Sequence, residues 1–209
     1  MELKMESAAD RSNGFAMAVI VEGGLAIIAL VFAWIFHVPL RERFPTVGMP
    51  LIVAIIRGLL ATLPMLAVFW LLVNSESPSL RQLRGQVEWL IREMFPTGSI
   101  GQFAMVAILA GVGEELLFRG ALQMKIGAWT TPVIGLVIAS LLFGLAHALS
   151  KLYFLFAVVV GVFLGWLALE YHDLAAPMVA HAMYDFVALV YLSRRLSVTP
   201  PIDDESTNC

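Results

Sequence analysis

Residues 103–119 read Phe103-Ala-Met-Val-Ala-Ile-Leu-Ala-Gly-Val-Gly113-Glu114-Glu115-Leu-Leu-Phe-Arg119. An apolar run therefore ends in two adjacent carboxylates and an arginine, and the chain is mostly apolar again from Ala121. Each ionisable group near the middle of a membrane helix costs roughly 2.5–3.5 kcal/mol on insertion scales. Three such groups so close together indicate a functional site buried in a membrane.

The composition supports a membrane protein. Hydrophobic residues make up 60% of the chain and charged residues 14%, whereas soluble domains have roughly 45–50% and 25%. The mean hydropathy is +0.86. The net charge of −3 offers no basic surface for nucleic acid. The single cysteine, Cys209, excludes an intramolecular disulfide, a cysteine-based metal site and a buried catalytic thiol.

The apolar runs are long enough for helices, whereas a barrel would show alternating segments of about ten residues. Residues 79–95 repeat apolar side chains at helical spacing among arginines and glutamates, which predicts an amphipathic helix at the membrane interface. We therefore expect an all-α, multi-pass transmembrane helical bundle of about six helices with one interfacial amphipathic helix. The predicted spans are residues 15–36, 51–73, 102–124, 131–149, 152–170 and 174–193.

The distribution of Lys and Arg predicts the topology. These residues are more frequent at the N-terminus, in residues 74–98 and at Arg194-Arg195 than on the opposite side of the predicted bundle. By the positive-inside rule, both termini are expected in the cytoplasm. The first fourteen residues mix acidic and basic side chains, unlike a signal peptide, so we expect the N-terminus to be retained.

Polar clusters occur on three different predicted membrane helices. A lone histidine there usually makes a hydrogen bond between helices, and a lone Glu–Arg pair is usually structural. Helix packing does not require three acid–base clusters in one small bundle, so the set indicates a function. The clusters are Glu114-Glu115-x-x-x-Arg119, Phe143-x-x-x-His147 and His181-x-x-x-Asp185.

Helical geometry divides the first cluster. Adjacent residues point about 100° apart, while residues four apart share a face. Glu115 is therefore expected to form a structural ion pair with Arg119, which leaves Glu114 aimed elsewhere and free to act as a base.

The other two clusters supply histidines. Phe143 lies one turn before His147 and is expected to pack beside its imidazole ring. His181 and Asp185 share a face, so the carboxylate can orient the ring or both can contact a ligand. By the predicted boundaries Glu114 lies near mid-membrane and His147 in the last turn of its helix, so their convergence requires tilted helices or shifted boundaries.

The sequence leaves open whether the site binds a metal ion. Glu114, His147 and His181 would suit zinc with an open fourth position. The His-Glu-x-x-His helix of soluble zinc peptidases is absent from the sequence. The cofactor is therefore unknown, and a metal-free mechanism is equally consistent with these residues.

In their order along the chain, the three clusters resemble the motif set of the CPBP intramembrane proteases. That family contains the CAAX endopeptidases that trim prenylated proteins, and bacterial Abi and bacteriocin-immunity proteins. The resemblance implies an endopeptidase of a bacterial-type plasma membrane that cleaves a protein or peptide substrate, with or without a prenyl group. It divides the chain into a polar tail at 1–14, two membrane helices plus the amphipathic helix at 15–97, a CPBP-like core at 98–193 and a polar tail at 194–209.

The resemblance also implies roles for single residues. Glu114 would be the general base that activates water with His147, and His181 with Asp185 would stabilise the oxyanion, while Glu115 and Arg119 would support the site. The family accepts Asn or Asp at the last position, and its CAAX proteases resemble the Asn form. An ionised Asp185 cannot donate a hydrogen bond to an oxyanion. This departure favours a role for Asp185 in orienting His181 or binding a metal, and weakens the case for CAAX substrates.

Two alternatives use the same residues. A non-proteolytic membrane protein of the Abi or immunity type would bind a peptide or partner in the cavity and would tolerate Glu114→Gln. A small transporter would use the carboxylates and histidines as a proton relay. Inverted repeats would support the transporter, and the sequence contains none that we can detect.

One further carboxylate lies in the first predicted span. Glu22 is followed by Gly23-Gly24, small residues that allow close helix contact, so Glu22 is expected to face the bundle. The sequence does not indicate whether it reaches the site.

Overall fold

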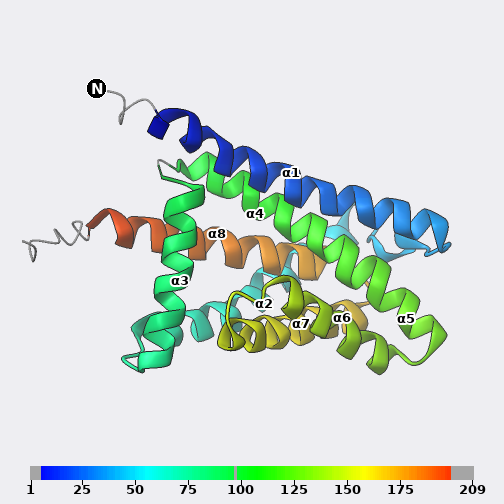
Figure 1. Ribbon diagram of the computed structural model, residues 1–209. Helices are drawn as coiled ribbons and strands as arrows, with labels where there is room; N and C mark the ends of the chain where they lie inside the picture. Colours follow the sequence, from blue (N-terminus) through cyan, green and yellow to red (C-terminus); the bar gives the residue numbers. More distant parts are fainter. Residues whose placement is uncertain (1–5, 97, 199–209) are drawn as a thin grey trace, which may run out of the picture.

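The computed structural model describes residues 6–96 and 98–198, and Figure 1 shows their arrangement. This part of the chain is helical without any strand, which confirms the predicted all-α bundle. The helices are α1 (Glu6–Ile35), α2 (Met49–Asn74), α3 (Pro78–Met94), α4 (Ile100–Glu114), α5 (Met124–Trp129), α6 (Pro132–Ala146), α7 (Lys151–Tyr171) and α8 (Ala175–Val198), with a short 3-10 turn η2 (Leu40–Arg43) and a π-helical segment η3 (Glu115–Gln123).

Five of the described helical stretches are long and apolar enough to cross a membrane. They are Gly14–Ile35, Met49–Asn74, Ile100–Trp129, Lys151–Tyr171 and Ala175–Arg195. The third is a continuous helix made of α4, η3 and α5, longer than the predicted span at 102–124.

The predicted span at 131–149 differs from the structure. It corresponds to α6, whose 15 residues reach roughly 22 Å, less than the ~30 Å hydrocarbon core. The side chain of Thr131 caps the start of α6 by accepting a hydrogen bond from the Ile134 amide. Ser150 caps the start of α7 in the same way. Residues 147–150 therefore form a turn, although their hydropathy resembles that of a continuing helix.

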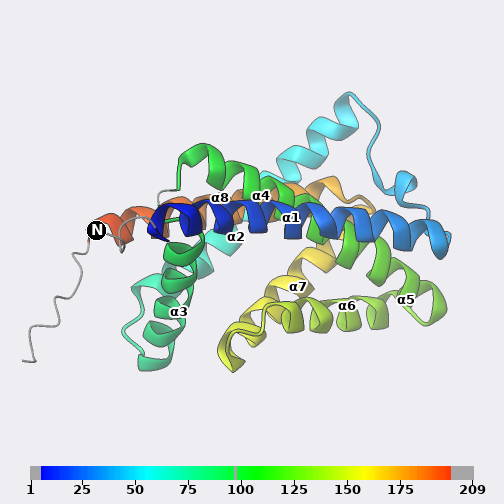
Figure 2. The same cartoon turned by 45° about the horizontal axis from the view of Figure 1, so that its top comes forward.

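Helix α8 runs through the bundle and packs against α2 and α4, while α1 covers another side of α4 and α6 pairs with α7 (Figures 1 and 2). Small residues permit these close contacts. A Cβ atom on Gly111 would lie 2.8 Å from Ala182, and one on Gly58 would lie 2.6 Å from the Ala176 carbonyl oxygen. Such contacts bring helix backbones together in a membrane, where apolar area alone does not drive association.

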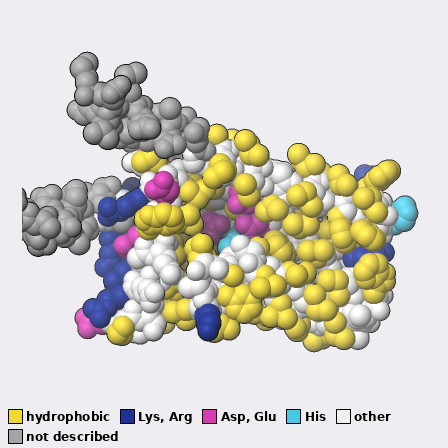
Figure 3. Space-filling view, in the orientation of Figure 1, with side chains coloured by type: hydrophobic (Ala, Val, Ile, Leu, Met, Phe, Trp, Pro, Cys, Tyr) yellow, Lys and Arg dark blue, Asp and Glu magenta, His cyan; other side chains and the backbone are white. Residues whose placement is uncertain are grey.

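Helix α3 matches the predicted amphipathic helix and crosses the end of the bundle where α1 begins and α8 ends (Figures 1 and 2). Its buried Ile91 packs with Val73 and Leu192. Arg84 donates a hydrogen bond to the Val73 carbonyl at 2.6 Å, near the C-terminal end of α2. On the face in Figure 3, Lys and Arg side chains gather at this end.

The predicted polar tails at 1–14 and 194–209 overlap the ends of two helices. Helix α1 already begins at Glu6, and α8 continues to Val198, beyond the predicted start of the C-terminal tail at 194. The rest of that tail, residues 199–209, lies outside the described part of the chain.

Candidate active site

The helix that carries the Glu-Glu motif changes its winding at the motif. Residue Glu114 ends α4, and Glu115 begins the π-helical segment η3, which contains Arg119. In a π-helix the backbone bonds run from residue i to i+5, so the turn is wider than in an α-helix. Such segments are often found at functional sites.

Glu115 and Arg119 form the ion pair that their spacing predicts. Arg119 Nη1 donates to Glu115 Oε1 at 2.7 Å, and both side chains are buried. Arg119 Nη2 also donates to the carbonyl of Gly161 in α7 at 3.2 Å. The guanidinium lies 4.3 Å from the centroid of the Phe143 ring. Because each charged group has a partner, this pair can remain buried and joins η3 to α6 and α7.

His181 joins the same group from α8. Its Nδ1 lies 2.8 Å from Glu115 Oε1, the oxygen that also accepts from Arg119. Its Nε2 lies 3.4 Å from Asp185 Oδ2, as expected for residues one turn apart. The contact between His181 and Glu115 was not predicted, because it depends on how α8 packs against η3 rather than on spacing within one helix.

Glu114 faces the other histidine. Its Oε2 lies 3.7 Å from His147 Nε2. The carboxyl is buried, and its Oε2 atom has no hydrogen-bond partner among the described residues. The His147 Nδ1 lies 2.9 Å from the Phe143 carbonyl oxygen. Because a carbonyl only accepts, Nδ1 carries a proton, and in the neutral ring Nε2 is then an acceptor directed at Glu114.

The short helix α6 explains how His147 reaches Glu114. His147 follows the last residue of α6, while Glu114 lies at the middle of the continuous helix Ile100–Trp129. Because α6 is too short to cross the bilayer, its C-terminal end stops at the level of Glu114. The predicted boundaries placed Glu114 and His147 at different depths, and the shorter α6 accounts for their contact.

Phe143 separates the two acid–histidine groups. Its ring centroid lies 4.5 Å from that of His147, as the sequence predicts, and 5.9 Å from that of His181. The side chains of His147 and Asp185 are 26% and 29% exposed, whereas those of Glu114, Glu115, Arg119 and His181 are buried. The site is therefore accessible from the side of His147 and Asp185. In Figure 3, acidic and histidine side chains are visible in a recess of a mainly hydrophobic face.

The described residues considered for zinc do not come together in one group. Among the described residues, no group of three His, Cys, Asp or Glu side chains could hold a metal ion. Glu114 contacts His147, whereas His181 contacts Glu115 and Asp185. Glu114 and His147 therefore form one group, and His181 belongs to a second group.

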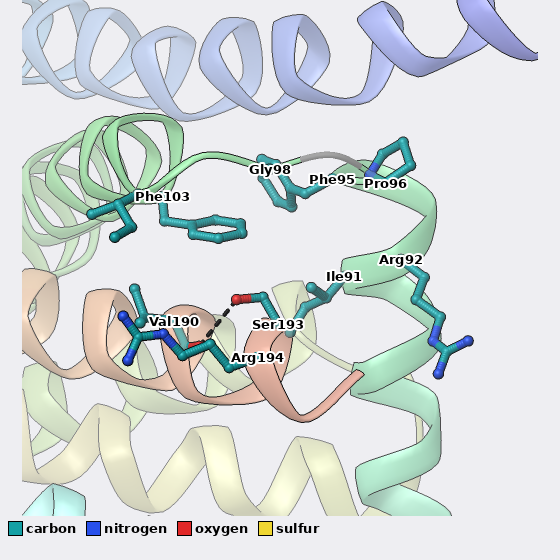
Figure 4. A pocket seen from close by; sticks show the side chains of 10 residues that line it. Ile91, Arg92, Phe95, Pro96, Gly98, Phe103, Val190, Ser193 and Arg194 are labelled. Atoms are coloured by element: carbon teal, nitrogen blue, oxygen red, sulfur yellow. Dashed lines mark hydrogen bonds between the residues drawn. The ribbon is translucent and has the colours of Figure 1, made fainter. Parts of the chain in front are cut away.

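A separate cavity of about 410 Å³ lies between α3, the start of α4 and the end of α8 (Figure 4). Apolar residues including Ile91, Phe95 and Phe103 line it, together with Arg92 and Arg194. None of the acid or histidine residues of the site lines this cavity.

The fold and the site together define a multi-pass helical membrane protein with a buried glutamate–histidine centre. Residues 96–187 match the sequence model of a family described as type II CAAX prenyl endopeptidase Rce1-like. This match covers less than half of the chain, and it supports the resemblance to the CPBP proteases that the three motifs carry.

One curated relative adds to this match. An uncharacterized protein of Bacillus subtilis (strain 168), YpbD, is 35% identical over 99 residues, which cover 46% of this chain and 48% of YpbD. The chain thus matches about half the length of this relative. No solved structure matches the chain.

Proposed function

We propose that this protein is an intramembrane endopeptidase in which Glu114 and His147 activate a water molecule for attack on a peptide bond. The contact between these two residues is the observation that carries the proposal. Glu114 Oε2 and His147 Nε2 are 3.7 Å apart, and both are acceptors when the carboxyl is ionised and the ring is neutral. One water molecule can donate a hydrogen bond to each of them, and these two bonds hold the water and prepare it to lose a proton.

The second group would act on the carbonyl oxygen of the substrate. Glu115 accepts from His181 Nδ1 and fixes the ring, because Arg119 in turn holds Glu115. When the ring carries a second proton, Nε2 can donate either to Asp185 or to a developing oxyanion. In this proposal Asp185 orients His181 and holds its Nε2 proton in the ground state.

The substrate would be a protein or peptide segment that reaches the site at membrane level. The recess in Figure 3 is surrounded by hydrophobic side chains, which suits an apolar segment. The match to the CAAX prenyl endopeptidase family favours a C-terminal segment as the substrate, with or without a prenyl group.

The test uses the purified full chain in liposomes with one peptide in farnesylated and unmodified forms. We expect cleavage of at least one form by the wild type and no cleavage by Glu114→Gln. Glu88→Gln, at a carboxylate of α3 that pairs with Arg84 outside the site, serves as the matched control and should keep wild-type activity. Equal cleavage by Glu114→Gln and the wild type would exclude the proposal. Retention of a biological effect by Glu114→Gln without cleavage would favour the Abi-type binding function.

We also propose that both termini face the cytoplasm of a bacterial-type plasma membrane. Helix α1 begins and α8 ends at the same end of the bundle, and the basic residues of α3 lie at that end (Figure 1). Reporter fusions to residue 1 and residue 209 should both indicate the cytoplasmic side. Opposite locations of the two reporters would contradict this topology.

A further inference from the structure

A carboxylate outside the family match lies beside the site. Glu22 belongs to α1, whereas the matched residues begin at 96. At this level the backbones of α1 and α4 are in contact, because a Cβ atom on Gly113 would lie only 2.4 Å from the Glu22 carbonyl oxygen. Gly113 immediately precedes Glu114, so the absence of a side chain at 113 lets α1 approach the backbone beside Glu114.

The Glu22 side chain is half-buried and points into the same centre. Its carboxyl is close enough to that of Glu114 to share a hydrogen bond, and it also interacts electrostatically with Asp185 and His181. The Oε2 atom of Glu22 is buried without a hydrogen-bond partner among the described residues. Two carboxylates in contact inside a membrane repel strongly, so such a contact is stable when the pair shares one proton.

We propose that Glu22 is a positioning residue of the site, whose carboxyl shares a hydrogen-bonded proton with Glu114 and holds that side chain toward His147. This inference rests on the proposed function of Glu114. It explains how Glu114 is oriented, because among the described residues its ion-pair contact is with His147, at 3.7 Å. One oxygen of the Glu114 carboxyl would contact Glu22, while Oε2 remains directed at the water position.

The test compares Glu22→Gln with Glu22→Leu in the full chain in liposomes. The amide of Gln has nearly the same size as the carboxyl and can still donate to Glu114, whereas Leu cannot. We expect Glu22→Leu to lower kcat about tenfold or more with KM unchanged, and Glu22→Gln to restore kcat to within about threefold of the wild type. Glu76→Leu and Glu76→Gln, at an exposed carboxylate between α2 and α3, form the matched control pair and should have no effect.

Infrared difference spectroscopy provides a readout that does not depend on cleavage. The band of a protonated carboxyl group should disappear in both Glu22→Leu and Glu114→Gln, because each variant removes one member of the pair. Wild-type kcat in Glu22→Leu, equal damage by Leu and Gln, or persistence of the band would each overturn the role of Glu22. Loss of the band in both variants, in a protein that cleaves no peptide, would support the pair and contradict the protease function instead.

Discussion

The Nε2 atom of His147 lies 3.7 Å from Oε2 of Glu114, although the two residues belong to different helices and His147 lies just beyond the end of its own. The contact follows from the packing of α6 against η3, which begins directly after Glu114, and from the end of α6 at Ala146.

Replacement of His147 tests this contact. We expect His147→Ala to lower kcat by about 10²–10⁴-fold, the usual contribution of a general acid–base group, while thermal unfolding stays close to that of the wild type. His172→Asn is a suitable control, because this histidine ends α7 in the left-handed conformation that Asn tolerates. Near-normal turnover by His147→Ala would remove His147 from the mechanism.

Loss of Glu115 should affect stability more than loss of Arg119. Glu115→Ala leaves the buried Arg119 guanidinium without a carboxylate and should cost about 3–5 kcal/mol in the free energy of unfolding. Arg119→Met removes the charge itself and still leaves Glu115 facing His181, so a smaller loss is expected.

The double variant Glu115→Ala with Arg119→Met completes the double-mutant cycle. Its loss should be smaller than the sum of the two single losses, because no uncompensated charge remains buried. Denaturant unfolding in detergent micelles measures all three variants. Additive losses would show that the two side chains do not act as a buried pair.

Substitutions of Asp185 test whether this residue acts through its contact with His181 or through its negative charge. Asp185→Asn keeps a polar group beside His181 Nε2 and adds a donor, so we expect cleavage at or above the wild-type rate. Asp185→Leu removes the contact and should lower kcat by about tenfold. Comparison of farnesylated and unmodified peptides with Asp185→Asn would also reveal whether this position sets the preference for a prenyl group. Equal rates for Asn and Leu would exclude a polar role.

The close approach of α1 and α4 can be tested at Gly113. A methyl group there would lie 2.4 Å from a backbone oxygen that cannot rotate away. Gly113→Ala should therefore destabilise the protein by about 1–3 kcal/mol and lower kcat by moving Glu22 from Glu114. Gly23→Ala is the matched control on α1, because its added Cβ has no atom within 4 Å. A Gly113→Ala variant with wild-type stability would contradict the packing described for these helices.

Much of the site could be predicted because several of its side-chain contacts join residues of the same helix. The Glu115–Arg119 pair, the packing of Phe143 on His147 and the contact of His181 with Asp185 all join residues four apart. Helical geometry places such residues on one face whatever the rest of the chain does. The separation of Glu114 from Glu115 follows from the same geometry, and in the structure the two carboxyls contact different histidines.

The extent of α6 could not be predicted from hydropathy. Residues 147–150 are His147-Ala-Leu-Ser150, which are apolar enough on average to extend a predicted span. The hydroxyl of Ser150 begins a new helix, and the preceding turn returns the chain across the bundle. A capping hydrogen bond is a local event that an average over a long window does not detect.

The sequence by itself determined that this chain is a helical membrane protein and which acid and histidine residues are the candidates for its site, because charged groups are costly in a membrane and therefore rare there. The tertiary structure alone decided which of them meet. Contacts such as Glu115 with His181, and Glu22 with Glu114, join helices that are distant in sequence. They depend on which backbones approach closely, and small residues such as Gly113 allow that approach only where the two helices cross.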